Sequence, residues 1–159
     1  MISSIKRRVF GVVLTITVAG AGAMALAQDK DAILKDRQAT MKQQGKDAGT
    51  VKAYLTGKAE QTAAVAAATE LTQTTKKIPD LFPPGSGAPS ADGDYQPKPT
   101  VWTDWDKFLD AQKAAAAKAE ALLTAIKAGD KAAIQTAFAD LGKNGCGNCH
   151  TTFREKLKN

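Results

Sequence analysis

The sequence has very few of the residues that usually build metal and catalytic sites. Of its 159 residues, one is a histidine, two are cysteines and three are methionines. A structural zinc site normally takes four nitrogen or sulfur ligands, so one histidine and two cysteines cannot complete a tetrahedron. This scarcity argues against a structural zinc site and leaves few histidine, cysteine or methionine ligands for any metal.

Signals for β-strands and for nucleic-acid binding are also weak. Alternating runs of β-branched residues are few, alanine is abundant, and all six prolines lie between Pro79 and Pro99. The composition therefore predicts an all-α protein with one long connection. The formal net charge is +6, but no basic run is interleaved with aromatic residues, so we expect no nucleic-acid partner.

The chain does contain one motif with a specific chemistry, Cys146-Gly147-Asn148-Cys149-His150. C-x-x-C-H is typical of covalent haem attachment, in which both thiols add to the haem vinyl groups and the imidazole binds the iron. The motif uses both cysteines and the only histidine of the chain. It therefore predicts one covalently attached haem c, with His150 as the proximal ligand.

Other interpretations of the motif explain less. A zinc site lacks its fourth ligand, and a thioredoxin-like dithiol needs a βαβ setting, whereas the flanking sequence is helical in pattern. A disulfide across two residues closes a very small loop and would stabilise little. Since no catalytic base other than His150 lies near the motif, we expect a protein that is not an enzyme.

The N-terminal residues 1–27 have the pattern of a cleaved signal peptide. Lys6, Arg7 and Arg8 precede an uncharged stretch that ends in Ala25-Leu26-Ala27, an A-x-A cleavage site. The stretch is nearly long enough to be a retained membrane anchor, but its glycines and alanines favour removal. We expect cleavage after Ala27, no stable membrane anchor afterwards, and a periplasmic location, which suits thioether attachment.

The remaining residues 28–159 are expected to form a single domain, an antiparallel four-helix bundle. The loop over residues 78–100 is rich in proline and glycine. The haem is expected to lie between helices near one end of the bundle. The apolar spacing predicts helices over roughly 29–55, 60–77, 101–128 and 130–157.

Glycines and aromatic residues refine this picture. Gly45 and Gly49 are expected to loosen the first helix, whereas Gly129 and Asp130 are expected to end the third helix and cap the fourth. Trp102, Trp105 and Phe108 are spaced as either ordinary core or a cofactor wall, and the spacing leaves both open.

The second axial ligand of the iron can be narrowed by elimination. Met1 and Met24 are lost with the signal peptide, which leaves Met41 as the one methionine, on the apolar face of the first helix. A lysine ligand would need deprotonation far below its usual pKa. The residues thus leave Met41 or an open position. On the proximal side, Arg154 lies four residues after His150 and is expected near the same haem face.

Four segments together resemble the class II c-type cytochromes, the cytochrome c′ family. The strongest resemblance is residues 146–154, which read C-x-x-C-H-x-x-F-R. It is supported by Arg37-Gln38-Ala39-Thr40-Met41, Ile78-Pro79-Asp80-Leu81-Phe82 and Pro99-Thr100-Val101-Trp102. The resemblance covers nearly all of the mature chain and implies a four-helix bundle with the haem near its C-terminal end.

The resemblance also implies roles for individual residues. Arg37 and Gln38 are expected near the haem propionates, and Phe82 is expected to line the pocket. With methionine at position 41, the sequence resembles the six-coordinate, low-spin branch of the family. This resemblance implies Met41 as the distal ligand of the iron. The function implied is a one-electron carrier between other redox proteins. The alternative is a five-coordinate protein that binds nitric oxide or carbon monoxide at an open or displaceable distal site.

The sequence departs from the family pattern at two places. Residues 142–146 are one residue longer than the usual approach to the motif, so the fourth helix is expected to bulge there. The large aromatic residue expected before Phe82 is missing, since Asp80 and Leu81 stand there. Family members are often dimers through their first two helices, but the polar second helix leaves a monomer open here.

Overall fold

The computed structural model describes the backbone of residues 21–87 and 94–157, and the side chains of these ranges from residue 30 onward. The basic segment and most of the uncharged stretch of the predicted signal peptide lie outside the described residues. No helix within the described part of the chain is both long enough and apolar enough to cross a membrane.

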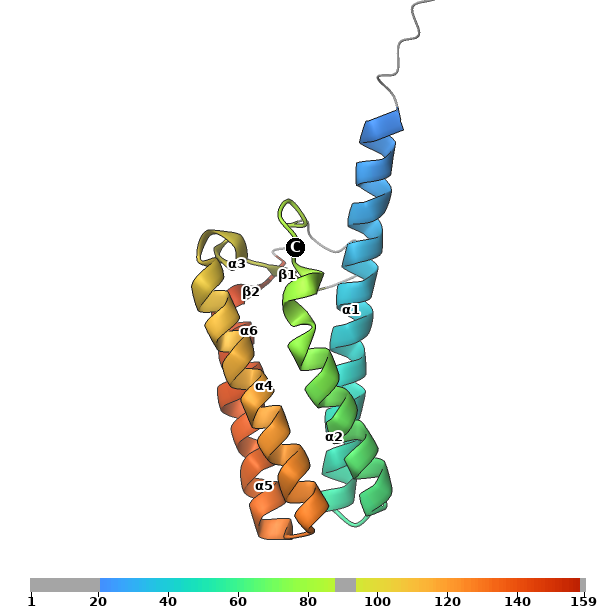
Figure 1. Ribbon diagram of the computed structural model, residues 1–159, viewed down its shortest axis with the longest axis vertical. Helices are drawn as coiled ribbons and strands as arrows, with labels where there is room; N and C mark the ends of the chain where they lie inside the picture. Colours follow the sequence, from blue (N-terminus) through green and yellow to red (C-terminus); the bar gives the residue numbers. More distant parts are fainter. Residues whose placement is uncertain (1–20, 88–93, 158–159) are drawn as a thin grey trace, which may run out of the picture.

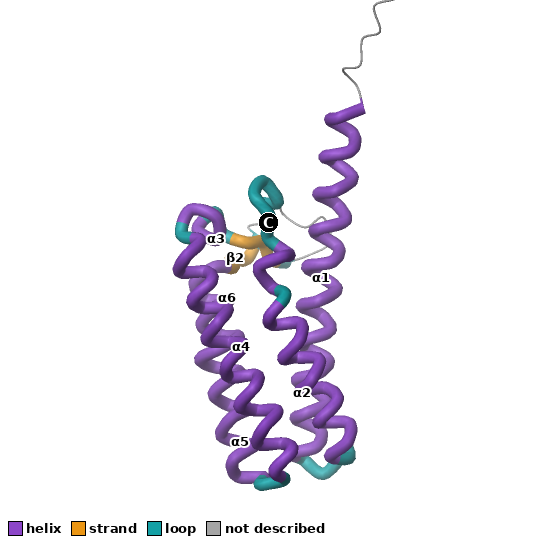
Figure 2. The backbone as a smooth tube through the Cα atoms, viewed as in Figure 1, coloured by secondary structure: helices purple, strands orange, loops and turns teal. Residues whose placement is uncertain are grey.

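Four long helical segments form an antiparallel bundle, as predicted (Figure 1). Within the described residues, the two strands form one short antiparallel pair (Figure 2). The elements in chain order are α1 (Ala21–Leu55), α2 (Gln61–Lys76), the 3-10 helix η1 (Ile78–Leu81), β1 (Tyr95–Pro97), α3 (Thr100–Thr103), α4 (Trp105–Ala128), α5 (Lys131–Asp140), the π-helix η2 (Leu141–Gly147), α6 (Asn148–Phe153) and β2 (Arg154–Lys156).

The predicted turn between the third and fourth helices is confirmed. Gly129 ends α4 in the left-handed conformation, with φ of 80°. The Asp130 carboxylate then accepts hydrogen bonds from the backbone N–H groups of Ala132 and Ala133, at 2.9 and 3.2 Å. Both features satisfy backbone groups that a helix end leaves without partners, so the chain reverses tightly at this corner.

Two predicted helix interiors are wrong in detail. The first helix is not loosened, because α1 continues through Gly45 and Gly49 to Leu55, and Val51 beyond them is fully buried. Packing of this face outweighs the low helix propensity of glycine. The third helix, predicted as one piece, breaks at Asp104 into α3 and α4. The break lets the Trp102 indole N–H donate to the carbonyls of Phe82 and Pro83, at 3.1 Å each.

The predicted C-terminal end of the fourth helix is also wrong. The helix ends at Phe153 instead of continuing to residue 157, because residues 154–156 pair as β2 with β1, antiparallel. The backbone N–H of Lys98 donates to the Phe153 carbonyl at 2.8 Å, and Lys98 Nζ donates to the Thr151 carbonyl at 3.0 Å. The predicted loop 78–100 therefore holds η1 and β1, and it satisfies the last carbonyls of the helix.

The buried core divides into two parts along the bundle. One part is aliphatic and rich in alanine, and it joins α2 and α4 to α1 and α5. The other part is aromatic and lies at the end where η1, α3 and α6 meet. Its buried residues are Ile78, Phe82, Val101, Phe108 and Phe153. Partly buried residues, among them Met41 and Cys149, pack against them. This aromatic end holds the candidate site.

The bulge predicted near residues 142–146 is confirmed. The last long helix changes from α to π over η2 and returns to α in α6. A π-turn holds one residue more than an α-turn, so it has room for the extra residue that the family resemblance implies. Gly145 lies in this turn, where an added Cβ would be 3.0 Å from Leu141 Cδ1 and 3.4 Å from Ala115 Cα of α4. A Cβ on Gly142 would meet nothing within 4 Å.

Replacement of Gly145 by alanine should therefore force Leu141 or α4 to shift. We expect Gly145→Ala to lower the free energy of unfolding by about 1 kcal/mol or more. Gly142→Ala, in the same π-helix, should leave stability unchanged or raise it slightly, because alanine has the higher helix propensity. Denaturant unfolding of both variants checks this. Equal stabilities for the two would contradict close packing at Gly145.

Asp47 is an unusual residue of α1, because its carboxylate is buried and only 7% of its surface is exposed. Its Oδ1 accepts a hydrogen bond from Gln43 Nε2 at 2.9 Å, whereas its buried Oδ2 has no hydrogen-bond partner among the described residues. Burial raises the pKa of Asp47, and the charge of Glu70 adds to this. The Gln43 hydrogen bond and the charge of Lys46 act in the opposite direction.

Asp47→Asn should remove a buried charge, so we expect the free energy of unfolding at pH 7 to rise by about 1 kcal/mol. Because the pKa of Asp47 is higher in the folded than in the unfolded protein, the folded state binds more protons between the two values. The wild type should gain stability as the pH falls through the folded-state pKa, and Asp47→Asn should lack this gain.

Denaturant unfolding of the haem-loaded protein at a series of pH values measures this difference. Asp36→Asn, an exposed carboxylate on the same helix, is the control and should keep the pH dependence of the wild type. Identical pH dependence in wild type and Asp47→Asn would show that Asp47 is not the group responsible.

Candidate functional site

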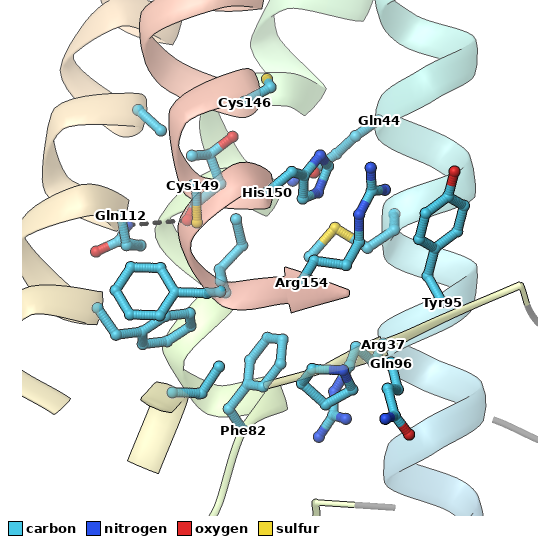
Figure 3. Close-up of a pocket in the computed structure, with 18 residues that line it drawn as sticks. Arg37, Gln44, Phe82, Tyr95, Gln96, Gln112, Cys146, Cys149, His150 and Arg154 are labelled. Carbon is cyan, nitrogen blue, oxygen red and sulfur yellow. Dashed lines mark hydrogen bonds between the residues drawn. The ribbon is translucent and has the colours of Figure 1, made fainter. Parts of the chain in front are cut away.

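A cavity lies at the aromatic end of the bundle, between α1, α4 and α6 (Figure 3). It contains about 840 Å³ of space not filled by atoms, part of it open to solvent. Its lining is mostly apolar, as is common for cofactor sites. Its lining residues are Arg37, Met41, Gln44, Thr75, Ile78, Phe82, Tyr95, Gln96, Pro97, Val101, Phe108, Gln112, Ala115, Cys146, Cys149, His150, Phe153 and Arg154.

The C-x-x-C-H residues form one wall of this cavity. Cys146 lies in η2, and Cys149 and His150 lie in α6, so spacings of three and four residues bring them to one side of the helix (Figure 3). Both cysteines are free thiols. Burial lowers the pKa of His150, and the nearby charge of Arg154 lowers it further. Both effects favour the neutral imidazole, which is the form that binds a metal.

The opposite wall is a face of α1. Arg37, Met41 and Gln44 recur at helical spacing and all line the cavity. Met41 is half-buried and packs against the aromatic cluster. Met41 and His150, the only histidine of the sequence, thus line the same cavity from different helices.

Arg37 is buried, with 6% of its surface exposed. Its Nε and Nη2 atoms donate to the Leu81 carbonyl at 2.9 and 2.8 Å, and Nη2 also donates to Ser86 Oγ at 2.8 Å. The guanidinium carbon lies 4.1 Å from the centroid of the Phe82 ring. Burial lowers the pKa of Arg37 to about 10, so the side chain stays charged at neutral pH. Arg37 therefore fixes the segment that carries Phe82.

Three phenylalanine rings make up much of the apolar wall. Phe108 meets Phe82 and Phe153 edge-on, with ring centroids 5.1 and 5.4 Å apart. Such edge-to-face contacts stabilise beyond the area they bury. Of the three aromatic residues considered for a cofactor wall, Phe108 lines the cavity. Trp102 and Trp105 line a neighbouring hollow behind Phe82.

One hydrogen bond joins two polar residues of the cavity wall. Gln112 Nε2 donates to the Thr75 carbonyl at 2.9 Å, which links α4 to the end of α2 (Figure 3). Gln112 is buried, and this bond satisfies its amide in an otherwise apolar setting.

The structure changes the element that carries Arg154, and it leaves Gln38 outside the cavity lining. Arg154 lines the cavity, but it is the first residue of β2 and not part of a helix with His150. Its guanidinium lies over the Tyr95 ring, 4.2 Å from the centroid. Gln38 is half-buried beside Arg37 and, unlike the other predicted site residues, is not among the described residues that line the cavity.

Sequence reasoning missed several lining residues, chiefly Gln44, Tyr95, Gln96 and Gln112. Gln44 and Gln112 follow the helical spacing of Met41 and Phe108, and this spacing could have indicated them. Tyr95 and Gln96 come from a segment without periodicity, and only the pairing of β1 with β2 brings them to the site.

The residues of the cavity fit a covalent haem. Two free thiols and an imidazole favoured in its neutral form share one wall, a thioether sulfur stands on another, and the remaining surface is mostly apolar. Thiols at this spacing beside a histidine are the donor set of haem attachment, and a histidine with a methionine is an established axial pair.

Comparison with known proteins agrees with this fit. The family described as Cytochrome C' matches residues 32–154. A cytochrome c-556 of Rhodopseudomonas palustris is 34% identical over 149 residues, covering 89% of this chain and 97% of that protein. A cytochrome c' of the same organism is 33% identical over 143 residues, covering 89% of this chain and 92% of that protein.

The fold is also similar to that of solved cytochrome c' structures. A solved structure of a cytochrome c' with ligand-controlled dimer dissociation has a TM-score of 0.72 at 25% identity, and it covers 80% of this chain and 97% of that chain. The family match, the relatives and the site that fits the cofactor together show that the chain belongs to the cytochrome c′ family and is a haem protein with one covalently attached haem c.

Proposed function

We propose that the protein is a one-electron carrier in which Cys146 and Cys149 hold the haem covalently and His150 and Met41 are the axial ligands of its iron. The observation that carries the proposal is the position of Met41, which lines the same cavity as His150 from a different helix. When bound, haem supplies a reversible one-electron Fe(III)/Fe(II) couple, whose potential the thioether of a methionine ligand raises.

The residues of the chain would then hold the haem in a largely apolar and rigid site. Phe82, Phe108 and Phe153 give the cavity an apolar wall, and their ring contacts resist rearrangement. Arg37 keeps the Phe82 segment in place through its hydrogen bonds to Leu81 and Ser86. A site that changes little between its two oxidation states favours fast electron transfer and keeps small molecules off the iron.

The comparisons support this proposal at the level of names. The relatives called cytochrome c-556 cover most of this chain, and a methionine at position 41 agrees with the six-coordinate branch of the family. The physiological partners would be other redox proteins, and no catalytic reaction is proposed. Export to the periplasm after cleavage behind Ala27 agrees with the haem motif and with the N-terminal pattern.

The oligomeric state forms part of the same proposal. One solved relative is described as a dimer whose dissociation is controlled by a ligand. A homodimer would agree with that relative, and the family resemblance implies α1 and α2 as its contact surface. Analytical ultracentrifugation of the haem-loaded protein distinguishes a dimer from a monomer.

A second candidate function is the binding of nitric oxide or carbon monoxide at the distal position. It is supported by the relatives named cytochrome c' and by the half-buried state of Met41, whose flexible side chain a small ligand could displace. In that case the wild-type protein would bind carbon monoxide rapidly.

Replacement of Met41 separates the two functions. Met41→Leu keeps the volume of the side chain but removes the sulfur, so we expect the optical spectrum to change from low-spin to high-spin. The reduced variant should bind carbon monoxide at least tenfold faster than the wild type, because its distal position is open. Spectra of the reduced protein with and without carbon monoxide measure both effects.

Leu81→Ala is the control, since Leu81 packs against the same aromatic cluster but cannot bind iron. It should keep the low-spin spectrum. A Met41→Leu spectrum that stays low-spin would rule out Met41 as a ligand, and a high-spin wild type that binds carbon monoxide at once would favour the second function.

A further inference from the structure

The strand pair β1–β2 lies along the edge of the haem cavity, where the sequence predicted a loop for residues 95–97 and helix for residues 154–156. Tyr95 is opposite Lys156, and Pro97 is opposite Arg154, in an antiparallel register. The pair is held at both ends, because Leu157 N–H donates to the Asp94 carbonyl at 2.8 Å and Lys98 N–H donates to the Phe153 carbonyl at 2.8 Å. It therefore forms a fixed support for the side chains on it.

The register places Tyr95 and Arg154 on the same face as diagonal neighbours. The Arg154 guanidinium carbon lies 4.2 Å from the centroid of the Tyr95 ring, well within the range of a cation–π contact. The other side-chain contact across the pair, Gln96 Nε2 to Glu155 Oε1 at 2.8 Å, involves the residues between them. The ring of Tyr95 thus holds a guanidinium that β2 alone would leave free to rotate.

The Arg154 guanidinium that contacts Tyr95 lies near His150, the proximal ligand. Arg154 and His150 line the same cavity, with Tyr95 beside them (Figure 3). Arg154 begins β2 directly after α6, the helix that carries His150. A positive charge at this position favours Fe(II) over Fe(III), because the reduced iron carries one positive charge less.

We propose that Tyr95 is a positioning residue, which fixes the guanidinium of Arg154 at the edge of the cavity and thereby raises the reduction potential of the bound haem. The inference rests on the attachment of haem through Cys146, Cys149 and His150, but it does not require Met41 as a ligand. Because Tyr95 is 46% exposed and Arg154 is exposed, the contact is partly screened by salt, and its effect is expected to be a modest fraction of the effect of Arg154 itself.

Spectroelectrochemical titration of haem-loaded variants at low ionic strength tests the proposal. Arg154→Gln should lower the reduction potential. Tyr95→Leu should lower it in the same direction by a smaller amount, whereas Tyr95→Phe, which keeps the ring face, should retain the wild-type value. In the double variant, Tyr95→Leu should add nothing to Arg154→Gln. Raising the salt concentration should shrink the difference between Tyr95→Leu and the wild type.

The chain offers a matched control in its other tyrosine. Lys131 Nζ lies 5.9 Å from the centroid of Tyr54 at the opposite end of the bundle, so Tyr54→Leu removes a similar contact far from the haem. It should leave the potential unchanged. Tyr95→Thr, which suits a strand, serves as a second variant if Tyr95→Leu does not fold.

Three results would overturn the proposal. They are an unchanged potential in both Tyr95→Leu and Tyr95→Thr, an equal shift in Tyr95→Phe, or additive shifts in the double variant. Optical spectra of every variant test Met41 ligation separately, so a failure of the proposed function can be told from a failure of the role of Tyr95. A high-spin wild type would reject Met41 ligation while leaving the comparison of potentials valid.

Discussion

The buried guanidinium of Arg37 ties α1 to the segment after η1, and the aromatic wall of the site rests on this tie. A charged group with so little exposure is costly to bury unless its N–H groups find acceptors. The Leu81 carbonyl and the Ser86 hydroxyl supply them, which selects one conformation for a segment without periodic structure of its own. That conformation brings Phe82 under the guanidinium and against Phe108.

The division of the core explains why the cavity lies at this end of the bundle. Where α2 meets α4, buried positions such as Ala64, Ala68 and Ala119 let the helices approach closely. Towards η1 and α6 the buried residues become phenylalanines, whose larger rings hold the helices further apart and line the cavity. The same four helices thus form a close-packed support at one end and a cofactor site at the other.

Features set by neighbouring residues were predictable from the sequence. The haem motif, the Gly129–Asp130 corner and the bulge before Cys146 each depend on a few consecutive residues, and each of the last two has the expected form in the structure. The placement of Cys146, Cys149 and His150 on one wall followed from their spacing in the motif. For Met41 the residues left an open distal position as the alternative, and the family resemblance indicated it as the ligand.

Features set by distant residues were not predictable. The sequence after Phe153 is compatible with helix, and only the pairing of β2 with β1 ends α6 there. Tyr95 reaches the site for the same reason. Gly45 and Gly49 indicate flexibility locally, but the burial of Asp47 and Val51 on the same helix shows that packing decides the outcome. In each case, contacts across the bundle outweighed local preference.

The π-helix has a consequence for how the last helix can vary in length. An extra residue in an α-helix advances everything after it by about 1.5 Å and turns it by about 100°. Such a rotation would carry His150 and Phe153 away from the side on which Ile134 and Leu141 are buried. The wide turn of η2 takes up the residue where it is inserted, so the phase of the helix on either side is preserved. The approach to the haem can therefore grow by one residue while the cysteines and the histidine still face the cavity.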